Sequence, residues 1–406
     1  MPRKPQHKDK ALAVLRAHAL KLIHARNSYA LSAFLICPPF NHSAKHLIDA
    51  PDPHGDTLVH FAARAHDVAA LRILVTEFGG DARAVNEHGR QPIHEAIDSA
   101  DCIRFLVTEC GVDINAMKRG DWTPLMIAVW DVGNTQISKA MKGNYEVMKI
   151  LVTAGANVEM ANKDGWNALH QAAKEDHYDA TTYLALLSPV STLRASTSGR
   201  LPIHTATLLL APTSLPTIPL FLLANSPLPP STLLAQRDNA GLSLLPLAVI
   251  SGNLSLICTL LRTYHADANT RDLTGRQPAH HAAMSGREEV LRVLWEETGG
   301  RVEVDREDEW DRWTPLFHAA KEGHLGVVRW LAEVARVEVR RKDRKGRQAV
   351  ELAAARNHAD VVLYLSSLPE DDRAERMPAK DNAQETADGP GRVPGTDDSW
   401  RTGTVS

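Results

Sequence analysis

Histidine has more potential for chemistry in this sequence than any other residue type, because nineteen imidazoles are present and imidazole is a common zinc ligand. Their spacing argues against a metal site. The adjacent pair His280-His281 would diverge on a helix, since only residues three or four apart share a face. Five histidines instead recur in one short motif, and they are His60, His94, His170, His204 and His280. We therefore expect structural histidines and no bound metal.

The four cysteines are equally scattered. No two of them have the two-residue spacing of a zinc knuckle or a redox motif, and they are Cys37, Cys102, Cys110 and Cys258. Free thiols fit a reducing compartment, so the sequence predicts a cytoplasmic or nuclear protein. Phosphate-cradling glycine loops and serine nucleophile elbows are missing from the sequence. We expect a chain that is not an enzyme and uses no cofactor.

Composition narrows the class of partner. The chain has 406 residues, 44% of them hydrophobic and only 5% aromatic, so we expect a core of aliphatic side chains between closely packed helices. Lysine and arginine number 46 against 49 aspartate and glutamate, for a formal charge of −3. A chain so close to neutral has no overall electrostatic attraction to nucleic acid or to an anionic membrane. The sequence favours a protein partner and a chain that is monomeric when alone.

The histidine motif belongs to a repeat. Residues 89–96 read GRQPIHEA, residues 199–206 read GRLPIHTA and residues 275–282 read GRQPAHHA. Weaker copies contain Thr123-Pro124-Leu125 and Thr314-Pro315-Leu316. The position equivalent to that threonine occurs at 57, 91, 123, 167, 201, 243, 277, 314 and 348. An apolar helical stretch follows most copies, as at Val147-Met148-Lys149-Ile150-Leu151, so each unit carries two helices.

A period of about 33 residues with a Thr-Pro-Leu-His-x-Ala motif resembles the ankyrin-repeat family. The resemblance covers roughly residues 52–367 and implies an all-α solenoid of stacked helix-turn-helix repeats with β-hairpin fingers. In that family the motif histidine ties the hairpin to the helix. The physical chemistry agrees, because proline suits the first helical turn, threonine can cap it, and glycine suits the preceding turn.

The resemblance also divides the chain. We expect a helical N-terminal cap at 1–50, an array of about nine repeats at 51–368, and a disordered tail at 369–406 that is poor in aliphatic residues. Three units are long, near 123–165, 201–240 and 277–312. Their inserts are either partner sites or tolerated drift in loops.

The segment 201–236 contains no Asp, Glu, Lys or Arg. Six prolines between positions 212 and 230 interrupt it, which disfavours a membrane-spanning helix, although membrane association through this segment stays open as an alternative. A second alternative is that the chain is a non-catalytic accessory subunit, or an enzyme, within a biosynthetic or regulatory complex.

Partners of ankyrin arrays lie along the concave face, on the hairpin tips and first helices. The residue just before each Thr-like position is expected to point there. Arginine and tryptophan, the types most enriched in binding hot spots, dominate this row, and the candidate partner-binding residues are Arg90, Trp122, Trp166, Arg200, Arg276, Trp313 and Arg347. The row predicts a scaffold or adaptor that binds an extended acidic or mixed-character peptide. The alternative is structural, since the family often places Arg or Trp here without a binding role.

Overall fold

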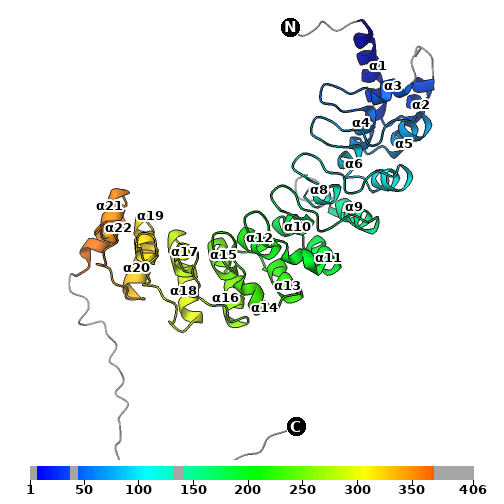
Figure 1. Ribbon diagram of the computed structural model, residues 1–406. Helices are drawn as coiled ribbons and strands as arrows, with labels where there is room; N and C mark the ends of the chain where they lie inside the picture. The colour runs from blue at the N-terminus through cyan, green and yellow to red at the C-terminus, as the bar shows by residue number, and fades with distance from the viewer. Residues whose placement is uncertain (1–6, 37–43, 131–140, 370–406) are drawn as a thin grey trace, which may run out of the picture.

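The computed structural model describes residues 7–36, 44–130 and 141–369 of the chain. Helices pair along these residues, and successive pairs stack into a curved array (Figure 1). The first helices of the pairs line the inner side of the arc and the second helices line its outer side (Figure 1). The predicted all-α solenoid of stacked repeats is confirmed.

Each of nine repeats contributes one first helix. These are α4 (Leu58–Arg64), α6 (Pro92–Glu95), α8 (Pro124–Trp130), α10 (Ala168–Lys174), α12 (Pro202–Leu209), α15 (Leu244–Ser251), α17 (Pro278–Met284), α19 (Pro315–Glu322) and α21 (Ala349–Ala355). Every one begins directly after a Thr-like position. Proline occupies the first turn of α6, α12, α17 and α19, where a missing amide hydrogen costs nothing.

The second helices complete the repeats. They are α5 (Val68–Arg72) with the π-helical turn η1 (Ile73–Glu77), α7 (Ala100–Arg104) with η2 (Phe105–Glu109), α9 (Met141–Thr153), α11 (Tyr178–Leu187), α13 (Thr217–Asn225), α16 (Leu254–Arg262), α18 (Glu288–Glu297), α20 (Leu325–Glu333) and α22 (Ala359–Ser367). Alanine pairs such as Ala282 and Ala283 are fully buried between neighbouring repeats. Small side chains let the helices approach closely, so the core is a continuous aliphatic layer along the stack.

Three further helices precede the first repeat: α1 (His7–His24), α2 (Ser28–Ile36) and α3 (Ala44–Asp49). Helix α1 packs on α4 and α2 packs on α5. Arg26 donates to the carbonyl of Ala65, and the Asp49 carboxylate accepts the amide of Asp81. These helices therefore cover the face of the first repeat that has no preceding neighbour.

A short loop, here called a finger, leads into each first helix. The nine fingers are residues 52–56, 86–90, 118–122, 162–166, 196–200, 238–242, 272–276, 308–313 and 343–347. In each finger the amide of the first residue donates to the carbonyl of the last, and one backbone hydrogen bond joins each finger to the next. The expected β-hairpins are thus tight loops, and the β-pairing in the described residues is one bridge between Lys118 and Trp122.

The long units have different origins. In the unit at 201–240, an additional helix α14 (Pro230–Ala235) lies between α13 and α15. In the unit at 277–312, finger 8 carries one extra residue, so its closing bond joins Asp308 to Trp313. The insert expected in the unit at 123–165 falls on residues 131–140, outside the described residues. The expected disordered tail, 369–406, also lies outside them from residue 370 onwards. Among the described helices, none is long and apolar enough to cross a membrane.

The candidate partner-binding surface

The motif histidines connect each finger to its own helix and to the next repeat. In repeat 4 the His170 Nδ1 accepts the amide of Asn167, and its Nε2 lies 3.0 Å from the carbonyl oxygen of Arg200. His60, His94 and His280 make the same two kinds of contact, and His204 makes the first. The structural role expected for these five residues is confirmed.

Burial of these imidazoles opposes their protonation. It lowers the pKa of His94, His170 and His204 to about 4, and that of His280 to about 3. Each ring is therefore neutral near pH 7. A second group, His324 and His358, lies at the inter-helix turns and bonds through Nε2 to carbonyls of the preceding repeat, Met284 and Lys321.

The seven candidate partner-binding residues are the last residues of their fingers, so the structure places them at equivalent positions of successive repeats. A shared first residue fixes the geometry. In eight fingers that residue is Asp, Asn or Ser, and its side-chain oxygen accepts the amide of the last residue. These are Asx-type turns, which hold the loop without help from a strand.

The arginines of the row are already paired. Arg200 bonds to Asp238 at 3.0 Å and Arg276 to Asp308 at 3.5 Å, in each case the first residue of the next finger. Arg347 bonds instead to Asp343 of its own finger. The carboxylates are almost fully buried, whereas the arginine side chains remain 27% to 38% exposed. These arginines therefore join the repeats and still present part of the guanidinium to solvent.

The tryptophans of the row differ in exposure. Trp166 is half-buried and stacks on His170, and Trp122 is half-buried beside Trp130. Trp313 is only 8% exposed and donates from Nε1 to Asp343 at 3.2 Å. Its ring offers a partner little surface, so among the row the accessible aromatic faces are those of Trp122 and Trp166.

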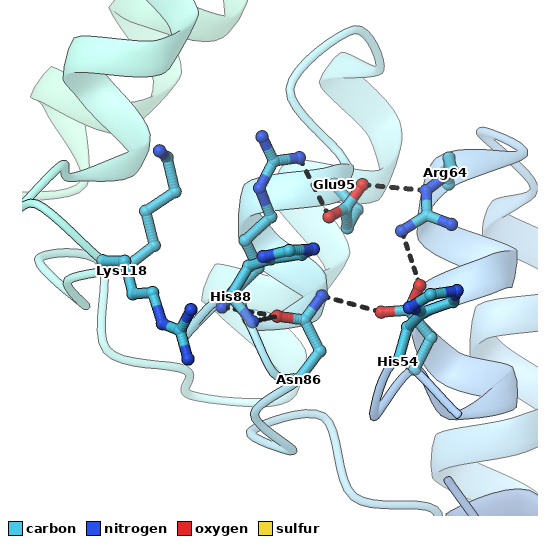
Figure 2. A pocket seen from close by; sticks show the side chains of 9 residues that line it. His54, Arg64, Asn86, His88, Glu95 and Lys118 are labelled. Carbon is cyan, nitrogen blue, oxygen red and sulfur yellow. Dashed lines mark hydrogen bonds and ion pairs between the residues drawn. The ribbon is translucent and has the colours of Figure 1, made fainter. Parts of the chain in front are cut away.

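A hollow of about 530 Å³ opens between fingers 1, 2 and 3 (Figure 2). Its lining is almost entirely charged or polar and consists of His54, Asp56, Arg64, Asn86, His88, Arg90, Glu95, Lys118 and Arg119. Arg90 is the only one of these that the sequence pattern predicts as a partner-binding residue. The others belong to the fingers and first helices. The sequence pattern predicts that these elements face a partner, but it does not single out these residues.

An unbroken chain of ion pairs forms one wall of the hollow. Arg64 bonds to Asp56 at 2.8 Å and to Glu95 at 2.9 Å, and Glu95 bonds in turn to Arg90 at 3.1 Å (Figure 2). Burial would raise the pKa of both carboxyls, but their hydrogen bonds outweigh it and hold each pKa below its ordinary value. Carboxylates of this kind are weak bases, which does not suit proton transfer near neutral pH.

Lys118 lines the opposite side of the hollow and departs from the rule of the other fingers (Figure 2). It stands where the other eight have Asp, Asn or Ser, so finger 3 lacks the side-chain acceptor for its last amide. Burial, and then the charge of Arg90, lower the pKa of Lys118. An alignment of the first residues of the fingers would have shown from sequence alone that Lys118 is exceptional. An alignment of the last residues does not show it.

Metal binding and thiol chemistry are the remaining possibilities in the part of the chain that the structure describes. No group of three His, Cys, Asp or Glu side chains is placed to hold a metal ion within those residues. Cys102, Cys110 and Cys258 are free thiols, and burial raises the pKa of each. Cys37 lies outside the described residues.

Comparison with known proteins identifies the family. The family model of ankyrin repeats, built from three copies, matches residues 25–118, 137–211, 245–343 and 299–374, which together are well over half of the chain. The chain belongs to the ankyrin-repeat family. Ankyrin repeats generally mediate protein–protein interaction and are typically non-catalytic.

Individual relatives are similar over limited regions. The Notch-regulated ankyrin repeat-containing protein of Homo sapiens is 34% identical over 23% of this chain and 68% of its own length. The protein of that name in Xenopus tropicalis is 37% identical over 19% of this chain, and the match spans only 59% of that protein. The ankyrin repeat protein nuc-2 of Neurospora crassa is 27% identical over 61% of this chain and 25% of its own length.

Proposed function

We propose that this protein is a scaffold or adaptor that binds another protein along the inner side of its arc, through the finger tips, the last residues of the fingers and the first helices. It acts without catalysis and without a cofactor, in the cytoplasm or the nucleus. Nucleic acid and membranes are not part of this proposal, because a net charge near zero provides no overall attraction to either.

The observation that carries the proposal is the row of partly exposed side chains held at one register. Arg90, Arg200 and Arg276 each keep about a quarter to a third of their side-chain surface open, although a carboxylate holds the guanidinium in place. Side chains that are already ordered lose little conformational entropy when a partner docks. Such a preorganised row suits an extended chain of a partner protein better than a compact small molecule.

Crosslinking in cells followed by affinity purification and mass spectrometry tests the proposal. The full-length chain is compared with a row variant that carries Trp122→Ala, Trp166→Ala and Arg200→Ala. A control variant carries Arg72→Ala, Arg104→Ala and Arg262→Ala on the outer helices, where each arginine makes an exposed ion pair of small energetic value.

We expect the wild-type chain and the control variant to recover the same partner proteins and the folded row variant to lose them. Circular dichroism and thermal unfolding establish that both variants are folded. Equal recovery by the row variant would move the binding surface away from the inner side of the arc.

A further inference from the structure

Two basic residues that line the hollow between fingers 1, 2 and 3, Lys118 and Arg119, have no carboxylate partner within it. The contacts around Lys118 indicate what kind of group would pair with them. Elsewhere along the array, the last residue of one finger often bonds to the first residue of the next. Arg200 bonds to Asp238, Arg276 to Asp308 and Trp313 to Asp343 in this way. At these three of the eight junctions between consecutive fingers, a positive or N–H-donating side chain meets a carboxylate.

The junction of fingers 2 and 3 instead brings together two basic residues. Arg90 is the last residue of finger 2, and the first residue of finger 3 is Lys118. Two cations therefore stand where the array elsewhere pairs an arginine with an aspartate. Arg90 turns to Glu95 of its own repeat, and Lys118 has no carboxylate within ion-pair distance among the described residues.

The ammonium of Lys118 is also partly withdrawn from water, and the ring of Trp122 is a weaker partner for it than a carboxylate would be. The lysine side chain is partly buried, packs its Nζ 5.3 Å from the ring centre of Trp122, and has its pKa lowered by burial and by Arg90. A local departure that removes a side-chain acceptor and leaves a half-buried charge without a carboxylate is expected at functional positions rather than at random ones.

The charge of the hollow favours an anion. Four cations line it, Arg64, Arg90, Lys118 and Arg119, against the two carboxylates Asp56 and Glu95. Arg64 and Arg90 already neutralise those carboxylates, so the excess charge comes from Lys118 and Arg119. Glu87 on the rim bonds to His54 at 2.7 Å and lies 3.4 Å from His88.

We propose that this hollow binds a glutamate or aspartate side chain from an acidic segment of a partner protein, whose carboxylate takes the place of the aspartate that finger 3 lacks. This inference rests on the proposed function and names the chemistry of the partner. A volume of about 530 Å³ accommodates a carboxylate side chain with ordered water, since one water occupies about 30 Å³ in the liquid.

A polypeptide suits the hollow better than a nucleic acid does. Double-stranded DNA presents one negative charge per about 1.7 Å of helix axis. Only two cations of the hollow are free to match such charges, and Asp56, Glu87 and Glu95 would repel the rest. A segment with a few spaced carboxylates meets the cations without that repulsion.

Fluorescence anisotropy with the full-length chain tests the proposal. The probe is a fluorescein-labelled eight-residue peptide in which four glutamates alternate with serines, and the matched peptide has glutamine in place of glutamate. The chain is examined as wild type, Lys118→Asp, Lys118→Arg and Lys163→Asp. Lys163 is an exposed lysine of finger 4 that does not line the hollow, so its substitution makes the same charge change elsewhere.

We expect the wild type and Lys118→Arg to bind the glutamate peptide in preference to the glutamine peptide. Lys118→Asp should weaken binding by about tenfold or more, because it removes an attraction and adds a repulsion, whereas Lys163→Asp should change it by less than about threefold. Loss of folding does not explain that result, because Lys118→Asp supplies the missing Asx acceptor and a partner for Arg90, and its Tm should equal or exceed that of the wild type.

Equal binding of the two peptides, or equal binding by wild type and Lys118→Asp, would overturn the proposal. The result is separable from the fate of the proposed function. If the row variant loses its protein partners while Lys118→Asp keeps them and binds the peptide normally, the scaffold function stands and the acidic-segment site falls. If the glutamate peptide binds through Lys118 and the row variant keeps all its partners, the acidic-segment site stands and partner binding through the row of last finger residues falls.

Discussion

At the scale of single residues, a histidine side chain can serve as a structural hydrogen-bonding group or as a binder of protons and metals, and burial decides which role it has. The imidazole of His170 lies between Asn167 and the carbonyl of Arg200, and desolvation holds its pKa at about 4. An exposed histidine with an ordinary pKa would be open to protons and metals. This outcome could be predicted from sequence, because the histidine recurs at one position in five of the nine repeats and the resemblance to ankyrin repeats gives that position a structural role.

The buried histidines predict loss of stability in mild acid. In the unfolded chain a histidine has a pKa near 6.5, whereas His94, His170 and His204 have a pKa of about 4 in the fold. As the pH falls below 6.5 the unfolded state binds more protons than the folded state, so the free energy of unfolding decreases until about pH 4.

Thermal unfolding between pH 7.5 and pH 4 measures this dependence. We expect Tm to fall across the interval, and His170→Gln to fall less steeply than the wild type because one titrating group is gone. A Tm that stays constant from pH 7 to pH 4.5 in the wild type would contradict the assignment of neutral buried imidazoles.

The ion-pair chain of the hollow gives a second prediction at this scale. Glu95 has a buried carboxylate that holds both Arg64 and Arg90. Glu95→Gln removes the charge that both guanidinium groups need, and we expect a loss of about 1–3 kcal/mol in the free energy of unfolding by urea. Glu109→Gln breaks the exposed pair with Arg72 and should cost clearly less, because water screens that pair. Similar losses in the two variants would show that the ion pairs of the hollow stabilise the fold no more than an exposed ion pair does.

At the scale of elements, the finger is the unit whose conformation the sequence only partly reveals. The Gly-x-Thr-Pro pattern correctly located every turn and every first helix. It also suggested β-hairpins, but the described fingers close as short loops because an Asp, Asn or Ser oxygen replaces the hydrogen bonds of a strand pair. The extra helix α14 was not predicted, since prolines at 227, 229 and 230 indicate a broken segment rather than a new helix.

A matched pair of glycines tests how tightly the fingers pack. Gly241 has φ of +81°, and a Cβ there would lie 2.6 Å from the amide nitrogen of Leu273 in the next finger. Gly346 has φ of +77°, but a Cβ there would meet nothing within 4 Å. Both alanine variants carry the cost of the left-handed conformation, roughly 1–2 kcal/mol, and Gly241→Ala adds a backbone clash.

Urea unfolding of the two variants separates these costs. We expect Gly241→Ala to lose at least about 1 kcal/mol more than Gly346→Ala, because one of the bonds between fingers must also yield. Equal losses would indicate that the fingers move apart freely.

At the scale of the whole molecule, stability is distributed along a line of neighbours. Within the described residues, each repeat packs mainly on the repeats beside it, so a weak repeat is expected to divide the array into two cooperative parts. The repeat that contains α12, α13 and α14 is the candidate. It has no charged side chain between 201 and 236, it is interrupted by prolines, and it leaves Leu209 and Leu215 exposed.

Weakening this repeat further should split the unfolding transition. Leu222 in α13 is fully buried, and Leu222→Ala is expected to cost about 2–5 kcal/mol locally. The tryptophans on the two sides report separately if those of one half are replaced by phenylalanine. They are Trp122, Trp130 and Trp166 before the repeat, and Trp295, Trp310, Trp313, Trp330 and Trp400 after it. We expect non-coincident urea transitions for the two halves in Leu222→Ala. A single transition shared by both probes would show that the array unfolds as one unit.

The sequence by itself determined the family, the number and order of the repeats, the starts of the first helices and the role of the motif histidines. Those features could be predicted because the same residue types recur at the same positions of successive repeats, and this recurrence is visible in the sequence. Tertiary structure decided which side chains meet across repeats. Arg200 reaches Asp238 at a separation of 38 residues, whereas Arg90 lies beside Lys118 at a separation of 28, and only the rise and curvature of the stack bring each pair together. The hollow and its unmatched cations belong to that second kind of information, because they arise where three fingers meet.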